Sequence, residues 1–329
     1  MPTTLKPLRI GDIVIDFPVI LAPMAGYTDL AYRLLCRQFG APYCITEMML
    51  DRLLLVRGKV RSRLFKLTDQ DHPVAGQIIG NEPDVMAQAA KALCEIGFDA
   101  IDLNFACPVR KALSRKRGGY LMGRPDLAVE IVRAVKAAVA RPVTIKVRQK
   151  FLNSDTEENF YRIAEGALAA GAAAVTVHAR SVETKYHGPA DWEFLAAAKR
   201  RFAGSVIIGS GDVSSPAKAL EMIERTGVDA ASVARGALGN PWFFRQVRDL
   251  ADGHEPYKPT LAQQREVLLR HFTADCELYG PLKGPRHMRG FGVRYARLHA
   301  HPKEVRMAFV HVKRAEDWHA VLDRFYPAE

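Results

Sequence analysis

Residues 100–111, Ala-Ile-Asp-Leu-Asn-Phe-Ala-Cys-Pro-Val-Arg-Lys, begin as a short apolar run and end in a polar segment with a proline. The run over 100–103 predicts a buried strand, and Pro108 predicts a turn, because proline cannot continue a central strand. Asn104 and Cys107 therefore follow the carboxyl end of a strand, where α/β folds carry their chemistry. The thiol of Cys107 can be a nucleophile, a metal ligand or a proton donor. The alternative is that Cys107 is a buried residue with a purely structural role. No second cysteine lies at metal-ligand spacing from Cys107, so we expect no metal site.

The same unit of strand and helix recurs on both sides of this stretch. Helices are predicted over 83–96, 125–139 and 156–170, and Gly171, Gly204 and Gly227 stand where C-caps would end helices. Apolar runs predict eight strands, at 19–22, 43–46, 74–78, 100–103, 143–147, 174–178, 206–209 and 231–233. Eight strands that alternate with helices predict an α/β fold, the TIM (β/α)8 barrel. A hairpin over 8–17 would close the bottom of this barrel.

A doubly wound sheet is the alternative fold. It would carry a glycine-rich phosphate loop of the form G-x-G-x-x-G after its first strand. The first loop here is instead Pro23-Met-Ala-Gly26, whose small residues would let a flat ligand approach the backbone. The glycine-rich loops are Gly209-Ser-Gly-Asp212 and Ala234-Arg-Gly236, after the seventh and eighth strands. This order favours the barrel, whose phosphate site is formed there.

Composition and length indicate a globular protein with one large and one smaller domain. The chain has 329 residues, of which 48% are hydrophobic and 25% charged. There is no apolar signal core and no apolar run of membrane-spanning length, and the five cysteines have no paired spacing. We therefore expect a cytoplasmic, monomeric protein without a membrane partner. The linker Gly253-His-Glu-Pro-Tyr-Lys-Pro259 predicts a boundary between a barrel domain, 1–252, and a small all-α helical domain, 253–329.

Positive charge is concentrated in three segments of this basic chain, whose net charge is +11 and whose pI is about 9.5. Residues 283–314 contain nine basic residues and one acid, and further basic clusters lie at 110–117 and 52–66. Any one of these clusters could be a solvated helix face. Three clusters around one barrel mouth, with aromatic residues interleaved, indicate binding to the phosphate backbone of a nucleic acid.

Short motifs run along nearly the whole chain. They are Ala22-Pro-Met-Ala-Gly-Tyr-Thr-Asp29, Thr46-Glu-Met-Met49, Gln77, Asp102-Leu-Asn-Phe-Ala-Cys-Pro108, Lys146-Val-Arg148, Val177-His-Ala-Arg180 and Ala234-Arg-Gly-Ala-Leu-Gly-Asn-Pro-Trp242. Each is weak alone, but their order and spacing are specific. In these motifs the chain resembles the tRNA-dihydrouridine synthases, FMN-dependent barrels with a helical tRNA-binding domain.

The resemblance implies a reaction and a site. The C5–C6 bond of uridine in tRNA would be reduced to 5,6-dihydrouridine by FMN, which NADPH reduces. By position in the motifs, Cys107 would donate the proton, Asn104 would bind the uracil, and Arg148 would contact the substrate. The basic tail would bind tRNA through Arg286, Arg289 and Arg294. The cofactor contacts would come from Pro23, Met24, Ala25, Gln77, Lys146, His178, Ser210, Gly211, Asp212, Ala234 and Arg235.

The chain departs from the family pattern at three places. Ser210 stands where the family usually has asparagine, Ala106 replaces a glycine, and Lys116-Arg117-Gly118 replaces a Gly-Ala-Gly stretch. Two other functions stay open at this point. One is a different FMN barrel, such as a dihydroorotate-dehydrogenase-like enzyme, and the other is a barrel that binds RNA without catalysis.

Overall fold

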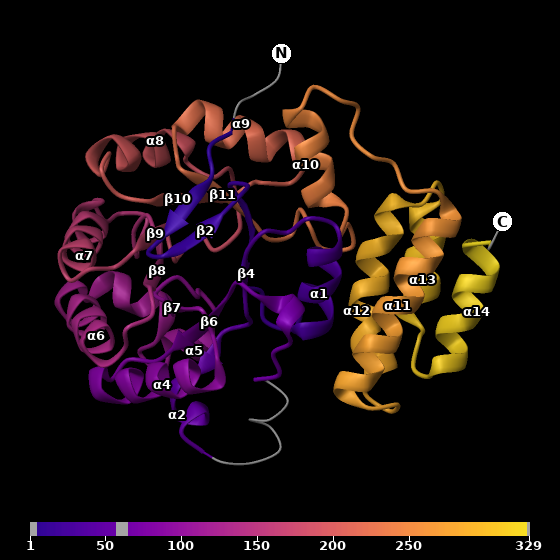
Figure 1. The fold of residues 1–329 in the computed structure, drawn as a ribbon, viewed down its shortest axis with the longest axis horizontal. Helices are drawn as coiled ribbons and strands as arrows, with labels where there is room; N and C mark the ends of the chain where they lie inside the picture. The colour runs from indigo at the N-terminus through magenta and orange to yellow at the C-terminus, as the bar shows by residue number, and fades with distance from the viewer. Residues whose placement is uncertain (1–4, 57–64, 328–329) are drawn as a thin grey trace.

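The computed structural model describes residues 5–56 and 65–327 of the chain. Within these residues, eight parallel strands close into a barrel, because β4 pairs with β3 on one side and with β6 on the other. The barrel strands are β3 (Val19–Leu21), β4 (Cys44–Ile45), β6 (Val74–Ile79), β7 (Ala100–Asn104), β8 (Val143–Arg148), β9 (Ala174–His178), β10 (Ile207–Ser210) and β11 (Ala230–Val233). The predicted TIM barrel is confirmed, and each predicted strand overlaps one of these (Figure 1).

Helices join successive strands and surround the barrel. They are α1 (Leu30–Gln38), α2 (Asp51–Leu54), α4 (Pro83–Ile96), α5 (Arg110–Leu113), α6 (Pro125–Ala138), α7 (Glu158–Ala169), α8 (Trp192–Arg201), α9 (Pro216–Thr226) and α10 (Phe243–Ala251), with short 3₁₀ turns at η1 (Asp69–Asp71) and η2 (Gly118–Gly123). Gly171 and Gly227 have left-handed φ values of 89° and 69° after α7 and α9, as predicted. The prediction for Gly204 is wrong. Helix α8 ends at Phe202, whose N–H bonds to Ala198 O, and Gly204 has no left-handed φ.

A hairpin closes the bottom of the barrel, as predicted. Strands β1 (Leu8–Ile10) and β2 (Ile13–Ile15) are antiparallel, and Gly11 has the positive φ of 62° that the tight turn between them requires. Leu8, Ile10 and Ile15 pack against a layer of residues near the start of the barrel strands, among them Ala75, Ala100, Ala174 and Ala230. Because the hairpin covers this end, the open end of the barrel, among the described residues, is at the carboxyl ends of the strands.

The second barrel strand is interrupted, which the sequence did not indicate. After β4 the chain leaves the sheet and returns as β5 (Met49–Leu50), which pairs with the end of β6. Glu47 and Met48 lie between the two short segments, at the carboxyl end of the barrel. This break places the segment Thr46–Met48 beside the mouth.

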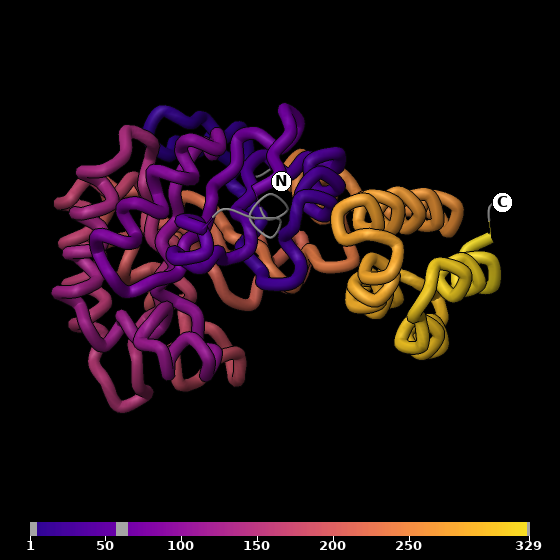
Figure 2. Tube along the Cα trace, turned by 90° about the horizontal axis from the view of Figure 1, so that it is seen from below, coloured from indigo at the N-terminus to yellow at the C-terminus, as the bar shows by residue number. Residues whose placement is uncertain are grey.

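Four helices follow the barrel, as expected for residues 253–329. They are α11 (Leu261–Tyr279), α12 (Gly284–Tyr295), α13 (Pro302–Val310) and α14 (Ala315–Phe325), with η3 (Ala296–Leu298) between α12 and α13. Their core includes Trp318, which stacks on Phe272 at 5.0 Å between ring centroids. Figure 2 shows the four helices to one side of the barrel. Among the described residues, no helix combines the length and apolar character that a membrane crossing would need.

The tail and the barrel are in close contact. Helix α11 packs on α1, where Tyr32 of α1 stacks on His271 of α11 with 5.5 Å between the ring centroids. Tyr32 also donates a hydrogen bond of 2.5 Å to Ala237 O in the turn after β11, within the barrel. In the same turn, Gly239 has a φ of 70°, and a Cβ there would lie 2.5 Å from Arg294 O of α12. The backbone of α12 can approach this turn only because residue 239 has no side chain.

Candidate active site

The turn after β7 presents Cys107 and is held by Asn104. Asn104 Oδ1 accepts hydrogen bonds from the backbone N–H groups of Ala106 (3.0 Å) and Cys107 (2.9 Å). An amide oxygen has two acceptor positions, and both are engaged here. The family resemblance predicted that Asn104 binds the uracil. That role stays a prediction, and the group left for it is the second N–H of Nδ2, which otherwise makes a contact of 3.8 Å with Met48 Sδ.

A chain of buried hydrogen bonds orients Asn104. Asn104 Nδ2 donates to Gln77 Oε1 (2.8 Å), and Gln77 Nε2 donates to Asp102 Oδ2 (2.6 Å). Thr144 donates to the other oxygen of Asp102, at 2.6 Å. Burial raises the pKa of Asp102 to about 6. Because an ionised carboxylate can only accept, Asp102 sets the direction of both amides, and Gln77 keeps one N–H and one acceptor position for a ligand. Asp102 was not among the predicted site residues, although an acid inside an apolar strand was a usable signal.

Cys107 is itself buried, and two glycines approach it closely. Burial raises the pKa of the Cys107 thiol, which therefore stays protonated at neutral pH. A Cβ on Gly118 would lie 2.9 Å from Cys107 Cβ, and one on Gly119 would lie 3.0 Å from Cys107 O. Lys116 has a φ of 55°, a left-handed conformation that favours glycine. The backbone at this position is thus glycine-like although Lys116 carries a side chain.

Two basic side chains, Lys146 and Arg148, lie on the next strand, β8. Burial and the charge of Arg148 lower the pKa of Lys146 to about 8. Arg148 donates to the backbone oxygens of Ala106 (2.8 Å), Ser181 (2.8 Å) and Lys185 (2.7 Å). Arg148 therefore braces the Cys107 turn against the loop after β9, and its predicted contact with substrate stays a prediction.

His178 ends β9 beside these charges. Its pKa is lowered by burial first and then by the positive charges of Lys146 and Arg148, so the imidazole is neutral. His178 Nδ1 is buried and has no hydrogen-bond partner within the described ranges. A buried polar atom without a partner is costly, so this nitrogen is suited to a bound ligand.

The loops after β10 and β11 meet at the same mouth. Gly211 has a φ of 118°, and a Cβ there would lie 2.8 Å from Ala190 Cβ, while a Cβ on Gly236 would overlap the carbonyl oxygen of Val213. Asp212, with a φ of 58°, accepts hydrogen bonds from Arg180 Nη2 and Ala190 N, both at 2.6 Å. Burial would raise the pKa of Asp212, but the hydrogen bonds from Arg180 and Ala190 lower it.

Two residues of this region were not among the predicted site residues. Arg180 Nη1 is buried and has no partner in the described part of the chain, and it lies 3.7 Å from where a Cβ of Gly211 would stand. Arg180 ends one of the quoted motifs, which was a usable signal. Tyr186 is half exposed and lies between two guanidinium groups, 5.5 Å from Arg148 and 5.1 Å from Arg235. No pattern in the sequence pointed to Tyr186.

The helical tail contacts two of the predicted cofactor loops. His287 of α12 donates through Nε2 to Gly26 O (3.2 Å), just after Pro23, Met24 and Ala25. Arg297 of η3 donates to Arg235 O (3.2 Å) and to Gly236 O. Ala234 and Arg235 are accessible, whereas Ser210 is buried. The tail therefore supports the loops after β3 and β11 from outside the barrel.

His287 lies in a polar cluster between the tail and the barrel. Its Nδ1 donates to Asp275 Oδ1 (2.8 Å) and lies 3.9 Å from Asp29 Oδ2. Burial alone would lower the pKa of His287, but Asp275 and Asp29 raise it. These three side chains are close enough to share a metal ion. Both ring nitrogens of His287 face acceptors, however, so hydrogen bonds from a protonated ring account for the cluster.

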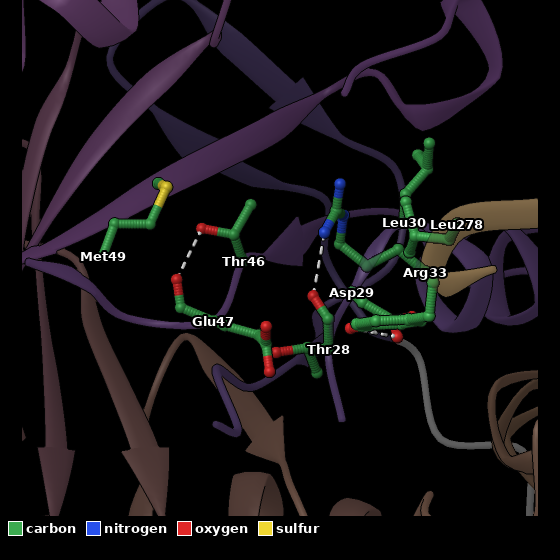
Figure 3. Close-up of a pocket in the computed structure, with 9 residues that line it drawn as sticks. Thr28, Asp29, Leu30, Arg33, Thr46, Glu47, Met49 and Leu278 are labelled. Carbon is green, nitrogen blue, oxygen red and sulfur yellow. Dashed lines mark hydrogen bonds between the residues drawn. The ribbon is translucent and has the colours of Figure 1, made fainter. Parts of the chain in front are cut away.

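Figure 3 shows a small cleft beside this cluster, between the start of α1, the segment after β4 and Leu278 of α11. Arg33 donates to Thr28 O (2.8 Å), and Thr46 donates to Glu47 O (3.0 Å). Glu47 also accepts a hydrogen bond from Gly26 N, so the backbone N–H and the backbone C=O of Gly26 are both hydrogen-bonded. The residues that line the cleft thus help to hold the loop after β3 in place.

Arg286, Arg289 and Arg294 lie on α12 of the tail, outside the barrel strands and loops that carry the Cys107 turn. All three are exposed on α12, and none forms an ion pair with any residue that the structure describes. The basic segment 110–117 follows Cys107 directly, in and after α5. Four residues of the third predicted cluster, Arg57, Lys59, Arg61 and Arg63, lie outside the described residues.

Comparisons with known proteins agree with this architecture. The "Probable tRNA-dihydrouridine synthase" of Rickettsia conorii is 36% identical over 84% of this chain and 83% of its own length. The "tRNA-dihydrouridine synthase B" of Pseudomonas aeruginosa is 38% identical over 86% of this chain and 84% of its own length.

Among solved structures, a 2-naphthoyl-CoA reductase complex matches 76% of the chain with a TM-score of 0.60 and 15% identity. The chain spans about half the length of that protein, 52%, so this match supports the barrel fold alone. The profile of the dihydrouridine synthase (Dus) family matches residues 20–327. The chain therefore belongs to the dihydrouridine synthase family.

Proposed function

We propose that this chain acts as a tRNA-dihydrouridine synthase that reduces the C5–C6 bond of uridine in tRNA to 5,6-dihydrouridine, with FMN as bound cofactor and NADPH as reductant. Curated relatives over most of the chain carry this name. The observation that carries the proposal is the turn after β7. There Asn104 holds a buried, protonated thiol at the open end of a barrel whose other end is closed.

The residues around the mouth fit FMN. At Gly211 and Gly236 a Cβ would clash with Ala190 and Val213, so these glycines let the loops at the mouth pack closely against each other. Arg180 Nη1 and His178 Nδ1 are buried without partners in the described ranges, so they are available to a bound ligand. We assign the phosphate to Ser210, Gly211, Asp212, Ala234 and Arg235, with Arg180 behind them. We assign the ring to Gln77, Lys146 and His178, with Pro23, Met24 and Ala25 packed against it.

Cys107 would supply the proton of the reaction. Reduction of the C5–C6 bond adds a hydride at C6, which bound FMN supplies, and a proton at C5, which Cys107 Sγ gives up. The raised pKa of the thiol keeps that proton in place before the reaction. Lys146, with a pKa of about 8, stays largely cationic at neutral pH and would stabilise negative charge that develops beside it.

The tail would bind the tRNA. We assign residues 1–252 to the catalytic domain and 253–329 to the tRNA-binding domain, in a cytoplasmic enzyme that acts as a monomer. Arg286, Arg289 and Arg294 support this division, because they are exposed and have no acidic partner among the described residues. Unpaired arginines on one helix are suited to phosphate oxygens.

The test is Cys107→Ala. The variant should keep FMN and tRNA binding and lose dihydrouridine formation by roughly 10²–10⁴-fold, because only the proton donor is removed. Dihydrouridine is measured in tRNA from a strain that lacks the gene and carries either variant or wild type. Cys94→Ala, on the outer helix α4, is the matched control and should be fully active. Near wild-type turnover of Cys107→Ala would contradict the assignment.

Two measurements on the wild type separate this proposal from its alternatives. The visible absorption spectrum of the purified protein reports bound flavin, and a binding titration with tRNA reports the nucleic-acid partner. Flavin without tRNA affinity would favour a different FMN barrel. Binding of tRNA by a colourless protein, into which added FMN cannot be loaded, would favour an RNA-binding barrel without catalysis.

A further inference from the structure

A hollow lies where the tail meets the barrel, apart from the Cys107 turn. Tyr27, from the loop after β3, forms one wall, and residues of α12 and α13 form the others. Its lining residues are Tyr27, Arg289, Gly290, Val293, Arg294 and Val310. Arg289 and Arg294 take part in the function proposed above through their charge. The other four lining residues have no role in it.

The hollow is open because residue 290, in the middle of α12, is glycine. Glycine inside a helix is destabilising relative to alanine, so its presence needs a reason. Two other glycines of α12 have one. A Cβ on Gly284 would lie 2.7 Å from Cys276 Sγ, and one on Gly292 would lie 2.6 Å from Phe309 Cγ. A Cβ on Gly290 would meet nothing closer than Tyr27 Oη at 3.7 Å, an ordinary contact. Packing within the chain therefore does not require Gly290.

The lining of the hollow combines apolar and cationic groups. The ring of Tyr27 and the side chains of Val293 and Val310 are apolar, and Val310 is 40% exposed. Arg289 and Arg294 flank them, exposed and without an ion pair to any described residue. An unstacked nucleotide has the complementary chemistry, because its base packs on aromatic and apolar side chains and its phosphate pairs with arginine.

We propose that this hollow binds one unstacked nucleotide of the tRNA, separate from the uridine that is reduced. The base enters the space left by Gly290, beside Tyr27 and Val293, and the adjoining phosphates contact Arg289 and Arg294. The inference rests on the proposed function, since it assumes that the tail binds tRNA. It adds a base contact to a surface that would otherwise recognise only phosphate charge.

The test fills the hollow. Gly290→Leu adds a side chain where a Cβ has room, and it replaces a poor helix former by a good one, so the melting temperature should be unchanged or higher. The dissociation constant for tRNA should rise roughly five- to a hundredfold, the effect expected for one lost base contact. Binding of inorganic polyphosphate, which needs only the arginines, should be unchanged. Gly204→Leu, at an exposed glycine of the barrel with open space around it, is the matched control and should bind both ligands like wild type.

The outcomes are distinct. If wild type binds tRNA and Gly290→Leu binds it equally well, the hollow holds no nucleotide and the inference is wrong, although the proposed function stands. If wild type does not bind tRNA, the proposed function itself has failed. Equal losses for tRNA and polyphosphate would mean an anion site without a base, which also overturns the inference. If Gly290→Leu melts below wild type, Val310→Phe is used instead, because it fills the same hollow from α13. Unchanged tRNA affinity of Val310→Phe would then show that the inference is wrong.

Discussion

Replacing Gly239 by alanine should loosen the tail from the barrel, and its effect can be calculated against a matched control. Gly239 has a φ of 70° in the turn after β11, and an added Cβ would lie 2.5 Å from Arg294 O and closer still to Arg294 C. Gly227 has nearly the same φ, 69°, at the end of α9, but nothing lies within 4 Å of its Cβ position. The two substitutions therefore share the backbone strain and differ only in the clash.

The magnitude follows from two contributions. A non-glycine residue in the left-handed region costs about 1–2 kcal/mol, and this applies to both variants. The clash applies only to Gly239→Ala, where the α12 backbone must move by about an ångström to restore ordinary contact, and overpacking of this kind costs about 1–3 kcal/mol. We expect a loss of about 2–5 kcal/mol of unfolding free energy for Gly239→Ala and about 1–2 kcal/mol for Gly227→Ala.

Urea denaturation followed by circular dichroism measures the loss of unfolding free energy in each variant. A tRNA titration of the folded variants measures the effect on tRNA binding. Because α12 carries Arg289 and Arg294, its displacement should weaken tRNA binding by Gly239→Ala and leave Gly227→Ala unaffected. Equal losses of stability in the two variants would refute the reasoning. They would mean that the contact between α12 and the turn after β11 contributes nothing beyond the left-handed backbone.

Three further predictions concern the tail. Reversal of Arg286, Arg289 and Arg294 to glutamate should weaken tRNA binding and reduce its log–log salt slope by roughly 0.7–0.9 for each lost phosphate contact. An unaltered slope in a variant that melts normally would exclude α12 from the RNA-binding surface. Arg297→Met removes the bonds to Arg235 O and Gly236 O and should lower FMN affinity roughly tenfold in a flavin-fluorescence titration, whereas Arg294→Met should not. Unchanged FMN affinity of Arg297→Met would show that the loop holds its shape without the tail. His287→Gln should melt below wild type by more at about pH 6 than at about pH 9. The folded-state pKa of His287 is raised above its ordinary value of 6.5 by Asp275 and Asp29, so its contribution is lost as the pH rises through the folded value. Burial raises the pKa of Asp275 to about 6, so protonation of this carboxyl reduces the contribution again at lower pH. A gap in melting temperature that widened between about pH 6 and pH 9 would contradict this.

Much of the fold could be predicted from local sequence. The strands of a parallel barrel are buried on both faces, so strands such as β3 and β9 appear as mostly apolar runs, and the amphipathic segments between the strands predict helices. The hairpin over 8–17 and the helical tail followed from the same patterns. The motifs around Asn104 and Cys107 indicated the family, which the family profile and the relatives confirm. These features depend on residues that are neighbours along the chain.

The sequence was less informative where side chains meet over long separations. Gly204 was predicted to be a helix C-cap, but the C-cap of α8 is Phe202, whose backbone N–H donates to Ala198 O. The amino-acid composition of this segment does not indicate which of the two residues ends the helix. The orientation of Asn104 depends on Gln77 and Asp102, which stand on two different strands. No sequence pattern records that chain of bonds, because it exists only when β6 and β7 are paired.

The tertiary structure alone decided how the tail serves the barrel. His287 reaches Gly26 across 261 positions of sequence, and Arg297 reaches the loop after β11 across about 60. In the sequence, both residues belonged to a basic segment whose only evident property was its charge. Which of its members face solvent and which face a loop predicted to bind the cofactor depends on the docking of α11 and α12 against α1 and the turn at Gly239. Burial and hydrogen-bond geometry in the folded chain make that distinction, because side chains of one type are equivalent until packing gives them different neighbours.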